Sequence, residues 1–461
     1  MKSTSTFRIY ALAFLLLSFY LADAKPPLLL NNISIVGKKK ELYLPKEIDR
    51  VPKGNDFRDP ESQFSYKHML ESENVAIFWD KIYGDDPMKN SDKEKRFDVK
   101  KLSSEVERFY HYYRDTLKMV EKGNSLTDKY KMIVIVFSDD KDRTAYGGGL
   151  EDKIGALWTP CQRINKMPFG TLAHELGHSF QYMSSIDAGT GPMGGIMEMS
   201  AQYMLWQVYS EWMTFENYHL VDFMKQTHYA FLHSANMYHS PYVLEYWSEK
   251  RGKDFFGKLS RSTQKGEDVV STYKRITNLN QQQFNDEMFD ASRHFITWDL
   301  KRVEKVAHQY ANQHYTILND AGKGWYRIDS TKCPQNYGYN GIKLNVPASG
   351  TKVHLEFEGI AGANGYGAVK LEKAGWRYGF VASLKDGNRV YGDINRSAKG
   401  KVNFVVPENT EYLWLVVSGA PTEHWPIVMR WGPPTDDDPK EEQWPYRIKL
   451  EGTTIDSSFI K

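Results

Sequence analysis

The spacing of apolar residues along the chain predicts which elements form and in what order. Between residues 97 and 120, apolar side chains recur at intervals of three and four, which predicts an amphipathic helix with one buried face. Val75–Trp79 and Met132–Phe137 are short apolar runs that predict strands, and the second run is uninterrupted, as in a strand buried on both faces. The first half of the chain is therefore expected to combine a sheet with helices.

A glycine-rich stretch follows these strands. The three consecutive glycines at 147–149 predict a loop or bulge, and Ile154–Trp158 predicts an irregular strand broken at Pro160. Because proline cannot donate a hydrogen bond to a neighbouring strand, we expect this strand at the edge of the sheet. Helices are then expected over 168–183 and 196–213, joined by a glycine-rich turn, and helical character continues after them.

Near Cys333 the pattern changes to short alternating strands separated by turn residues. Strands are expected at Val353–Phe357, Ala368–Leu371, Phe380–Ser383, Val402–Val406, Tyr412–Val417 and Arg447–Leu450. Strands of this number and spacing predict a β-sandwich or jelly-roll-like domain. The expected fold is an α+β domain followed by an all-β sandwich, divided into residues 1–24 (signal peptide), 25–66 (N-terminal leader), 67–330 (α+β domain) and 331–461 (β-sandwich).

The first 24 residues have the pattern of a secretory signal. Lys2 and Arg8 precede an apolar run of about a dozen residues, too short to span a bilayer, and Ala22-Asp23-Ala24 fits a cleavage site. A secreted or periplasmic protein cleaved after Ala24, with no membrane span, is therefore expected. The near balance of 60 basic and 58 acidic side chains argues against a nucleic-acid groove.

The sequence contains two cysteines, Cys161 and Cys333. In an exported protein they could pair, or both could stay reduced. The sequence leaves both alternatives open, and no CxxC spacing indicates a cysteine metal site.

The segment "AHELGHSF" carries the clearest chemical signal in the chain. His174 and His178 are four residues apart, so on a helix both imidazoles lie on one face and reach one metal ion. Glu175 follows the first histidine, where it can accept a proton from water that the metal activates. Chance supplies this motif in some chains, and a zinc hydrolase needs a third protein ligand.

Glu198 is the expected third ligand, and Asp187 is the weaker substitute. Glu198 lies twenty residues after His178, early in the second helix and beyond a turn that lets the two helices run antiparallel. The histidine that metzincins carry six residues after the motif is absent, because that position is Ser184. Glycine at 177, in the middle of the first helix, leaves room for a close neighbour.

This arrangement resembles the thermolysin-like gluzincin zinc metallopeptidases. The resemblance covers roughly residues 70–250 and is most specific at 154–202. It implies that His174, His178 and Glu198 are Zn²⁺ ligands and that Glu175 is the general base. It also implies that the edge strand expected at Ile154–Trp158 binds an extended peptide substrate by backbone hydrogen bonds.

The chain is similar, more broadly, to a family of exported bacterial proteins of uncharacterised function that join a zincin-like domain to a C-terminal β-domain. The segments that carry this likeness include "LEYWSEKRGKDF", "WRYGFVASLKDGNRVYGD" and "LWLVVSGAP". The similarity spans most of the chain after residue 24, and it implies an architecture more than a substrate.

One position departs from the gluzincin pattern, and one role that a peptidase needs is left unassigned by it. Gln202 stands where thermolysin-like enzymes commonly have an aspartate that orients a zinc-bound histidine, and its amide oxygen can still accept an imidazole N–H. A peptidase also needs a donor for the developing oxyanion. We favour His239 for this role; the alternatives are His228, His233, Tyr238 and Tyr242.

These observations predict an exported zinc metallopeptidase that hydrolyses peptide bonds in extracellular proteins or glycoproteins. Two rivals remain: a non-catalytic adhesion or binding module that keeps the metal helix for structure, and a protein that chiefly binds glycans through its β-sandwich. Most tryptophans of that domain are expected in its core, and the acidic loop 436–438 is expected to be solvated rather than calcium-binding. These tryptophans are Trp376, Trp414, Trp425, Trp431 and Trp444.

Overall fold

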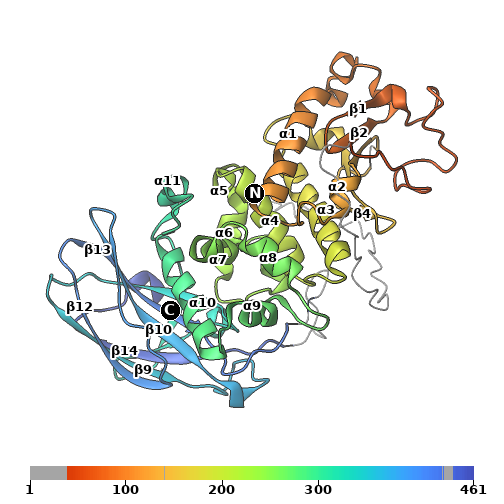
Figure 1. The fold of residues 1–461 in the computed structure, drawn as a ribbon. Coiled ribbons are helices and arrows are strands. Elements are labelled where there is room, and N and C mark those ends of the chain that lie inside the picture. The colour runs from red at the N-terminus through yellow and green to blue at the C-terminus, as the bar shows by residue number, and fades with distance from the viewer. Residues whose placement is uncertain (1–38, 140, 428, 430–439) are drawn as a thin grey trace.

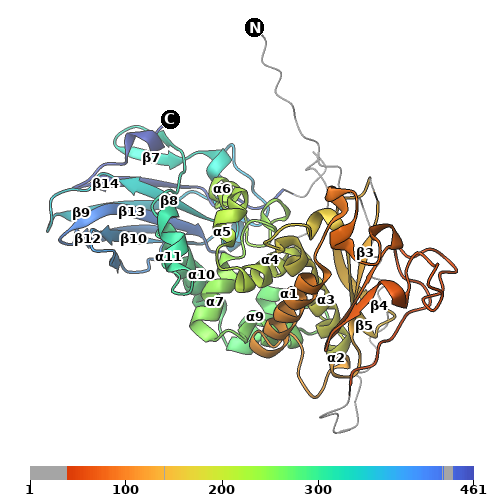
Figure 2. The same ribbon diagram turned by 90° about the horizontal axis from the view of Figure 1, so that it is seen from above.

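A computed structural model describes residues 39–139, 141–427, 429 and 440–461. The expected signal peptide, Trp431 and the acidic loop 436–438 lie outside these residues. The chain forms three parts in a row: an N-terminal sheet, a middle layer of helices and a C-terminal β-sandwich (Figures 1 and 2). Across the residues that the structure describes, no helix combines the length and the apolar character needed to cross a membrane.

The N-terminal sheet has five strands in the order β1-β2-β3-β5-β4. Their bounds are β1 Met69–Glu71, β2 Val75–Trp79, β3 Met132–Phe137, β4 Tyr146–Leu150 and β5 Ile154–Pro160. β2, β3 and β5 run parallel, whereas β1 and β4 pair antiparallel at the two ends. The two strands expected from apolar runs are confirmed with their bounds, and both are fully buried.

The position expected for the edge strand was wrong. β5 lies inside the sheet, and the edge strand is β4, which contains the three glycines expected to form a loop or bulge. Pro160 is compatible with this inner position because β4 pairs with β5 only as far as Tyr146, opposite Trp158. The missing N–H of Pro160 therefore lies past the end of β4.

Helices pack on one face of this sheet and fill the middle of the molecule (Figure 2). Their bounds are α1 Val99–His111, α2 Leu126–Lys129, α3 Gly170–Ala188, α4 Ile196–Val208, α5 Trp212–Phe215, α6 Asn217–Gln226, α7 Tyr242–Arg251, α8 Phe255–Arg261, α9 Val269–Thr277, α10 Gln281–Ile296 and α11 Glu304–Ala307. The helix expected over 97–120 is confirmed as α1 followed by a π-helical turn at Tyr112–Thr116.

The leader from residue 39 to 66 packs on the opposite face of the sheet. Ile48 and Phe64 are buried there against strand residues such as Phe78 and Ile135, and they form a second apolar core with them. The Trp158 indole also donates a hydrogen bond to the Asp49 carbonyl at 2.8 Å. This part of the leader is therefore built into the fold, with the sheet enclosed between it and the helices.

The C-terminal part is a sandwich of a four-stranded sheet, β11-β10-β13-β8, and a five-stranded sheet, β12-β9-β14-β7-β6. The bounds are β6 Leu318–Asp320, β7 Trp325–Ile328, β8 Tyr339–Leu344, β9 Lys352–Gly359, β10 Trp376–Leu384, β11 Arg389–Tyr391, β12 Lys399–Val405, β13 Thr410–Gly419 and β14 Tyr446–Glu451. Because β6 and β7 belong to this sandwich, it begins before residue 331. No strand forms at 368–371, where the chain bends and enters a 3₁₀ helix at Leu371–Lys373.

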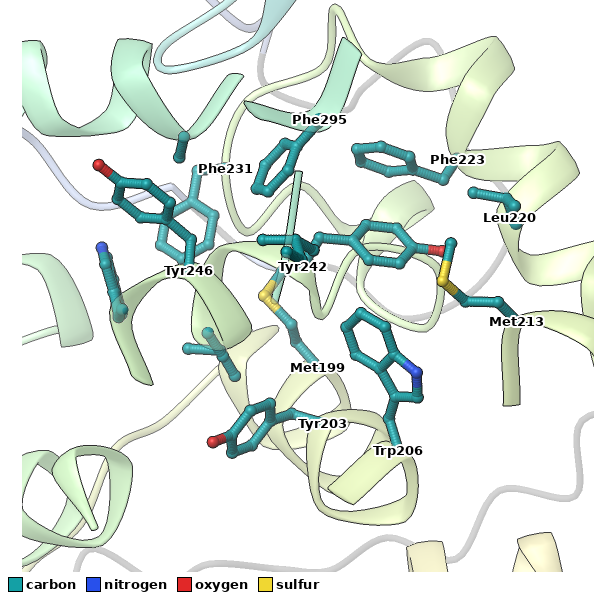
Figure 3. Packing of buried hydrophobic residues seen from close by; sticks show 14 of the residues in the cluster. Met199, Tyr203, Trp206, Met213, Leu220, Phe223, Phe231, Tyr242, Tyr246 and Phe295 are labelled. Carbon is teal, nitrogen blue, oxygen red and sulfur yellow. The ribbon is translucent and has the colours of Figure 1, made fainter. Parts of the chain in front are cut away.

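The helical layer and the sandwich share one continuous apolar core that runs from Val75 to Phe459. Figure 3 shows part of the helical layer, where Tyr242 lies among Trp206, Phe223 and Phe295. In the sandwich Trp376, Trp414 and Trp444 are buried, as expected of core residues, and Trp425 is half-buried against Trp444. Cys161 and Cys333 are both buried and unpaired.

Candidate metal centre

The crossing of α3 and α4 brings the predicted ligands together. A side chain at Gly177 would lie 3.3 Å from the Cα of Ala201, so glycine at this position of α3 lets the two helices pack closely. His174 and His178 lie one turn apart on α3, and Glu198 lies in the first turn of α4. Together they place two imidazoles and one carboxylate at the crossing.

Three side-chain atoms meet at this point. The Nε2 atoms of His174 and His178 are 3.1 Å apart, and each lies 3.2 Å from Oε2 of Glu198. Within the described residues, these three side chains form the one group of histidine, cysteine and acidic residues close enough to hold a metal ion. The assignment of these residues as zinc ligands stays a prediction.

Two glutamine amides fix the orientation of both imidazoles. The Gln202 amide nitrogen donates to the Tyr238 carbonyl, which can only accept, so its Oε1 faces Nδ1 of His174 at 3.1 Å. The Gln181 nitrogen donates in the same way to the Met197 carbonyl, so its Oε1 faces Nδ1 of His178 at 2.8 Å. Each histidine therefore carries a hydrogen on Nδ1.

This tautomer tests whether a cation fits the site. In the neutral histidines both Nε2 atoms present lone pairs, so the cluster consists of three acceptors and no donor. A cation bound by all three removes their mutual repulsion. A tetrahedral zinc ion with ligand distances of about 2.0–2.2 Å separates its ligands by about 3.3–3.5 Å, close to the separations in this cluster. The residues present fit a zinc ion.

Without a metal, a proton takes the place of a cation. Burial lowers the pKa of His178, but Glu198 outweighs this effect and raises that pKa to about 9. Burial likewise raises the pKa of Glu198, yet the two histidines hold it well below its usual range. The cluster is therefore a strong site for positive charge.

Glu175 lies beside this cluster, where α3 meets the edge strand β4. Burial raises the pKa of its carboxyl, opposed by the two histidines and by a hydrogen bond from the Gly147 backbone. A side chain at residue 147 would come within 1.9 Å of the Glu175 carbonyl oxygen, and one at Gly149 would overlap the Tyr182 ring. The glycines of β4 thus allow the strand to lie directly against α3.

Of the residues considered as donors to the oxyanion, Tyr238 lies at the cluster. Its ring stacks on His174 with a centroid separation of 6.2 Å, and burial together with the nearby Glu198 and Glu175 carboxylates raises the pKa of its hydroxyl. His239, which we favoured from the sequence, points elsewhere: its Nδ1 lies 2.7 Å from Nδ1 of His219. The hydrogen bond of the His239 side chain is therefore to His219 and not to a predicted metal ligand.

His219 and His239 extend the hydrogen-bond chain behind His174. The Gln202 nitrogen donates to Nε2 of His219 at 3.1 Å, which leaves the His219 hydrogen on Nδ1 for the bond to His239. Burial lowers the pKa of His219 to about 3, with a further contribution from His239 and His174, so the pair is neutral. His219 therefore accepts from Gln202, and His239 accepts from His219.

The other candidates lie away from the cluster. Asp187 accepts a hydrogen bond from the backbone of Leu126 at 3.2 Å, and burial raises its pKa to about 6. His228 is buried, with a pKa lowered to about 3. The orienting role of Gln181 was not predicted, although its i, i+3 spacing from His178 on one helix indicates it.

The fold and the site together define an α+β protein with a His–His–Glu cluster on two crossed helices and a C-terminal β-sandwich. The chain belongs to the family of unknown function DUF6055, which matches residues 34–457. No curated protein matches the chain.

Two solved structures are similar to parts of the chain. One is the M60 catalytic domain with the CBM51-1 and CBM51-2 domains from Clostridium perfringens ZmpB, at 10% identity and a TM-score of 0.28, over 86% of this chain and 60% of that one. The other is the Glycosylation Associate Protein (Gap123) complex from Streptococcus agalactiae, at 11% identity and a TM-score of 0.16, over 30% of this chain and 38% of that one. At these TM-scores neither similarity carries an argument about fold or chemistry.

Proposed function

We propose that this protein is an exported zinc metallopeptidase of gluzincin type that hydrolyses peptide bonds in extracellular proteins or glycoproteins. The observation that carries the proposal is the convergence of three acceptor atoms, from His174, His178 and Glu198, within 3.2 Å of one another. Glu175 beside them is the residue that a purely structural metal site does not need.

Glu175 is the proposed general base. A zinc ion in the cluster would supply Lewis acidity and lower the pKa of water to near neutrality. Burial raises the pKa of the Glu175 carboxyl, which makes it a better proton acceptor than an exposed carboxylate. It would take the proton from the attacking water and deliver it to the leaving amine.

Tyr238 is the proposed donor to the oxyanion, in preference to His239. Its ring stacks on His174 and its hydroxyl lies near the Glu198 and Glu175 carboxylates, whereas the side chain of His239 is engaged by His219. Burial and the two nearby carboxylates raise the pKa of Tyr238, so the hydroxyl keeps its proton and can donate it in a hydrogen bond. His239 acts in this scheme only through His219 and Gln202.

The edge of β4 is the proposed binding site for the substrate backbone. β4 ends its sheet and lies against α3 beside Glu175, so a peptide added as a further strand would pass the cluster. Gly147 and Gly149 have no side chains that would hold the strand away from the helix.

Metal analysis and a protease assay of the wild type beside Glu175→Ala test the proposal. We expect one equivalent of zinc in both proteins and a loss of kcat of about 10²–10⁴-fold in the variant. A wild type that binds zinc but cleaves neither proteins nor glycoproteins would favour a binding module instead. If neither protein binds zinc, the proposal fails.

A further inference from the structure

The β-sandwich contacts the helical layer through residues 335–339, which lead into β8. These residues run alongside residues 227–231, the start of the segment that carries Tyr238. Three backbone hydrogen bonds join the two stretches: Gln335 N–H to His228 O at 2.8 Å, Phe231 N–H to Asn336 O at 3.0 Å, and Tyr339 N–H to Thr227 O at 2.7 Å. The Ala230 N–H also donates to the side-chain oxygen of Gln335 at 2.9 Å.

The contact is close and is held firmly from the sandwich side. A side chain at Gly338 would lie 2.2 Å from the His228 carbonyl oxygen, so the two backbones touch there. Behind this contact the Tyr337 N–H donates to the Gly419 carbonyl at 2.9 Å, and the Trp444 indole donates to the Asn336 side chain at 2.8 Å. Residues 335–339 are therefore a fixed surface.

The segment from 227 to 239 connects this surface to the metal cluster. Its turns are closed by hydrogen bonds from residues 233, 236 and 239 to the carbonyls three positions earlier. At its far end the Tyr238 carbonyl accepts the Gln202 amide. The Leu232 carbonyl abuts Gly195, where an added side chain would meet it at 2.8 Å, just before α4 begins. These tight turns leave the backbone little freedom to move between Ala230 and Tyr238.

We propose that the β-sandwich contributes to the active site, because residues 335–339 set the position of Tyr238 over the metal-binding atoms. The inference rests on the proposed function, in which Tyr238 donates to the oxyanion. Gln335 and Gly338 are positioning residues in this scheme: they touch neither metal nor substrate and act through residues 227–239. The sandwich is then a support for catalysis and not a separable glycan-binding module.

Gln335→Ala in the full chain tests the proposal, with Gln443→Ala as the matched control. Gln443 belongs to the same sandwich and its amide also bonds to backbone, accepting from Gly367 N–H and donating to Ser330 O at 2.8 Å each, but these bonds do not involve residues 227–239. We expect Gln335→Ala to keep its zinc, to exchange the amide hydrogens of 227–241 faster, and to lose about tenfold or more in kcat with KM changed less than about twofold.

Several outcomes would overturn the inference. Amide exchange and kcat equal to those of Gln443→Ala would do so, as would faster exchange with unchanged kcat. Gly338→Ala, whose added carbon must push the His228 carbonyl away, should show the same effects more strongly if it folds. A wild type with no peptidase activity would end the proposed function, while amide exchange would still show whether residues 335–339 hold the segment.

Discussion

The side-chain oxygen of Gln202 lies 3.1 Å from Nδ1 of His174, and the amide nitrogen of the same glutamine donates to the Tyr238 carbonyl. One neutral side chain therefore orients a predicted metal ligand and holds the proposed oxyanion donor in place. An aspartate or glutamate could do the first and not the second, because a carboxylate has no hydrogen to donate to a carbonyl.

Gln202→Ala should lower the affinity for zinc by about 10–100-fold, because His174 loses the partner that fixes its tautomer. Titration against a competing chelator measures this affinity. Gln207→Ala is the matched control on the same helix, since that glutamine bonds to Glu245 instead. Gln202→Glu should recover zinc affinity relative to alanine yet stay low in kcat. An unchanged affinity in Gln202→Ala would contradict the role assigned to this residue.

Gly147→Ala should destabilise the protein by about 1–3 kcal/mol or more, because the added carbon would lie 1.9 Å from the Glu175 carbonyl oxygen and must push β4 from α3. A carbon added at the neighbouring Gly148 meets nothing within 4 Å, so Gly148→Ala should change stability little. Thermal unfolding of the two variants compares them. Equal effects would show that β4 does not lie against α3 as described.

Phe64→Ala tests whether the leader belongs to the fold. Phe64 is fully buried in the core on the back of the sheet, so its truncation should cost about 3–5 kcal/mol of unfolding free energy. Tyr66→Ala, at a side chain 45% exposed, should cost much less. Similar unfolding midpoints for Phe64→Ala and the wild type would mean that the leader detaches without loss.

A histidine and an aspartate at the contact between α10 and the sandwich should give a pH-dependent contribution to stability. His294 lies 3.3 Å from Asp299, which also accepts a hydrogen bond from Tyr391 of β11 at 2.8 Å. Burial opposes charge on His294, but Asp299 and Asp290 outweigh it and raise its pKa above 6.5. The hydrogen bond from His294 lowers the pKa of Asp299 to about 2.

The directions of the two pKa shifts define a pH range in which both contributions to stability are present. The contribution of His294 is fully present below pH 6.5 and is lost as the pH rises through its raised pKa. The contribution of Asp299 is present above pH 3.8 and is lost as the pH falls towards 2. His294→Ala should therefore lower the melting temperature most between these limits and least in alkaline buffer. A difference from wild type that does not vary with pH would contradict this.

Strands and helices whose apolar pattern is strong could be predicted from the sequence, and those shaped by tertiary contact could not. β2 and β3 are continuous apolar runs, so local pattern and burial agree. β4 was not predicted because its glycines allow the strand to pack against α3, and nothing in the local sequence indicates that neighbour.

The same distinction holds at the site. His174 and His178 lie four residues apart on one helix, so helix geometry alone brings them together, whereas Glu198 reaches them through the crossing of α3 and α4. Tyr238 and His239 are adjacent, and the choice between them depends on the turns from 230 to 239. Those turns are set by residues about a hundred positions further along the chain, beyond the reach of a local reading.

The continuous core between the helical layer and the sandwich also limits how this chain can change. A cut at the boundary expected from the sequence would leave β6 and β7 on one fragment and β14, the partner of β7, on the other, and would expose apolar surface on both. Expression trials should therefore keep the helices and the sandwich in one polypeptide. A chain that lost the sandwich alone would uncover the apolar face of its helices to water.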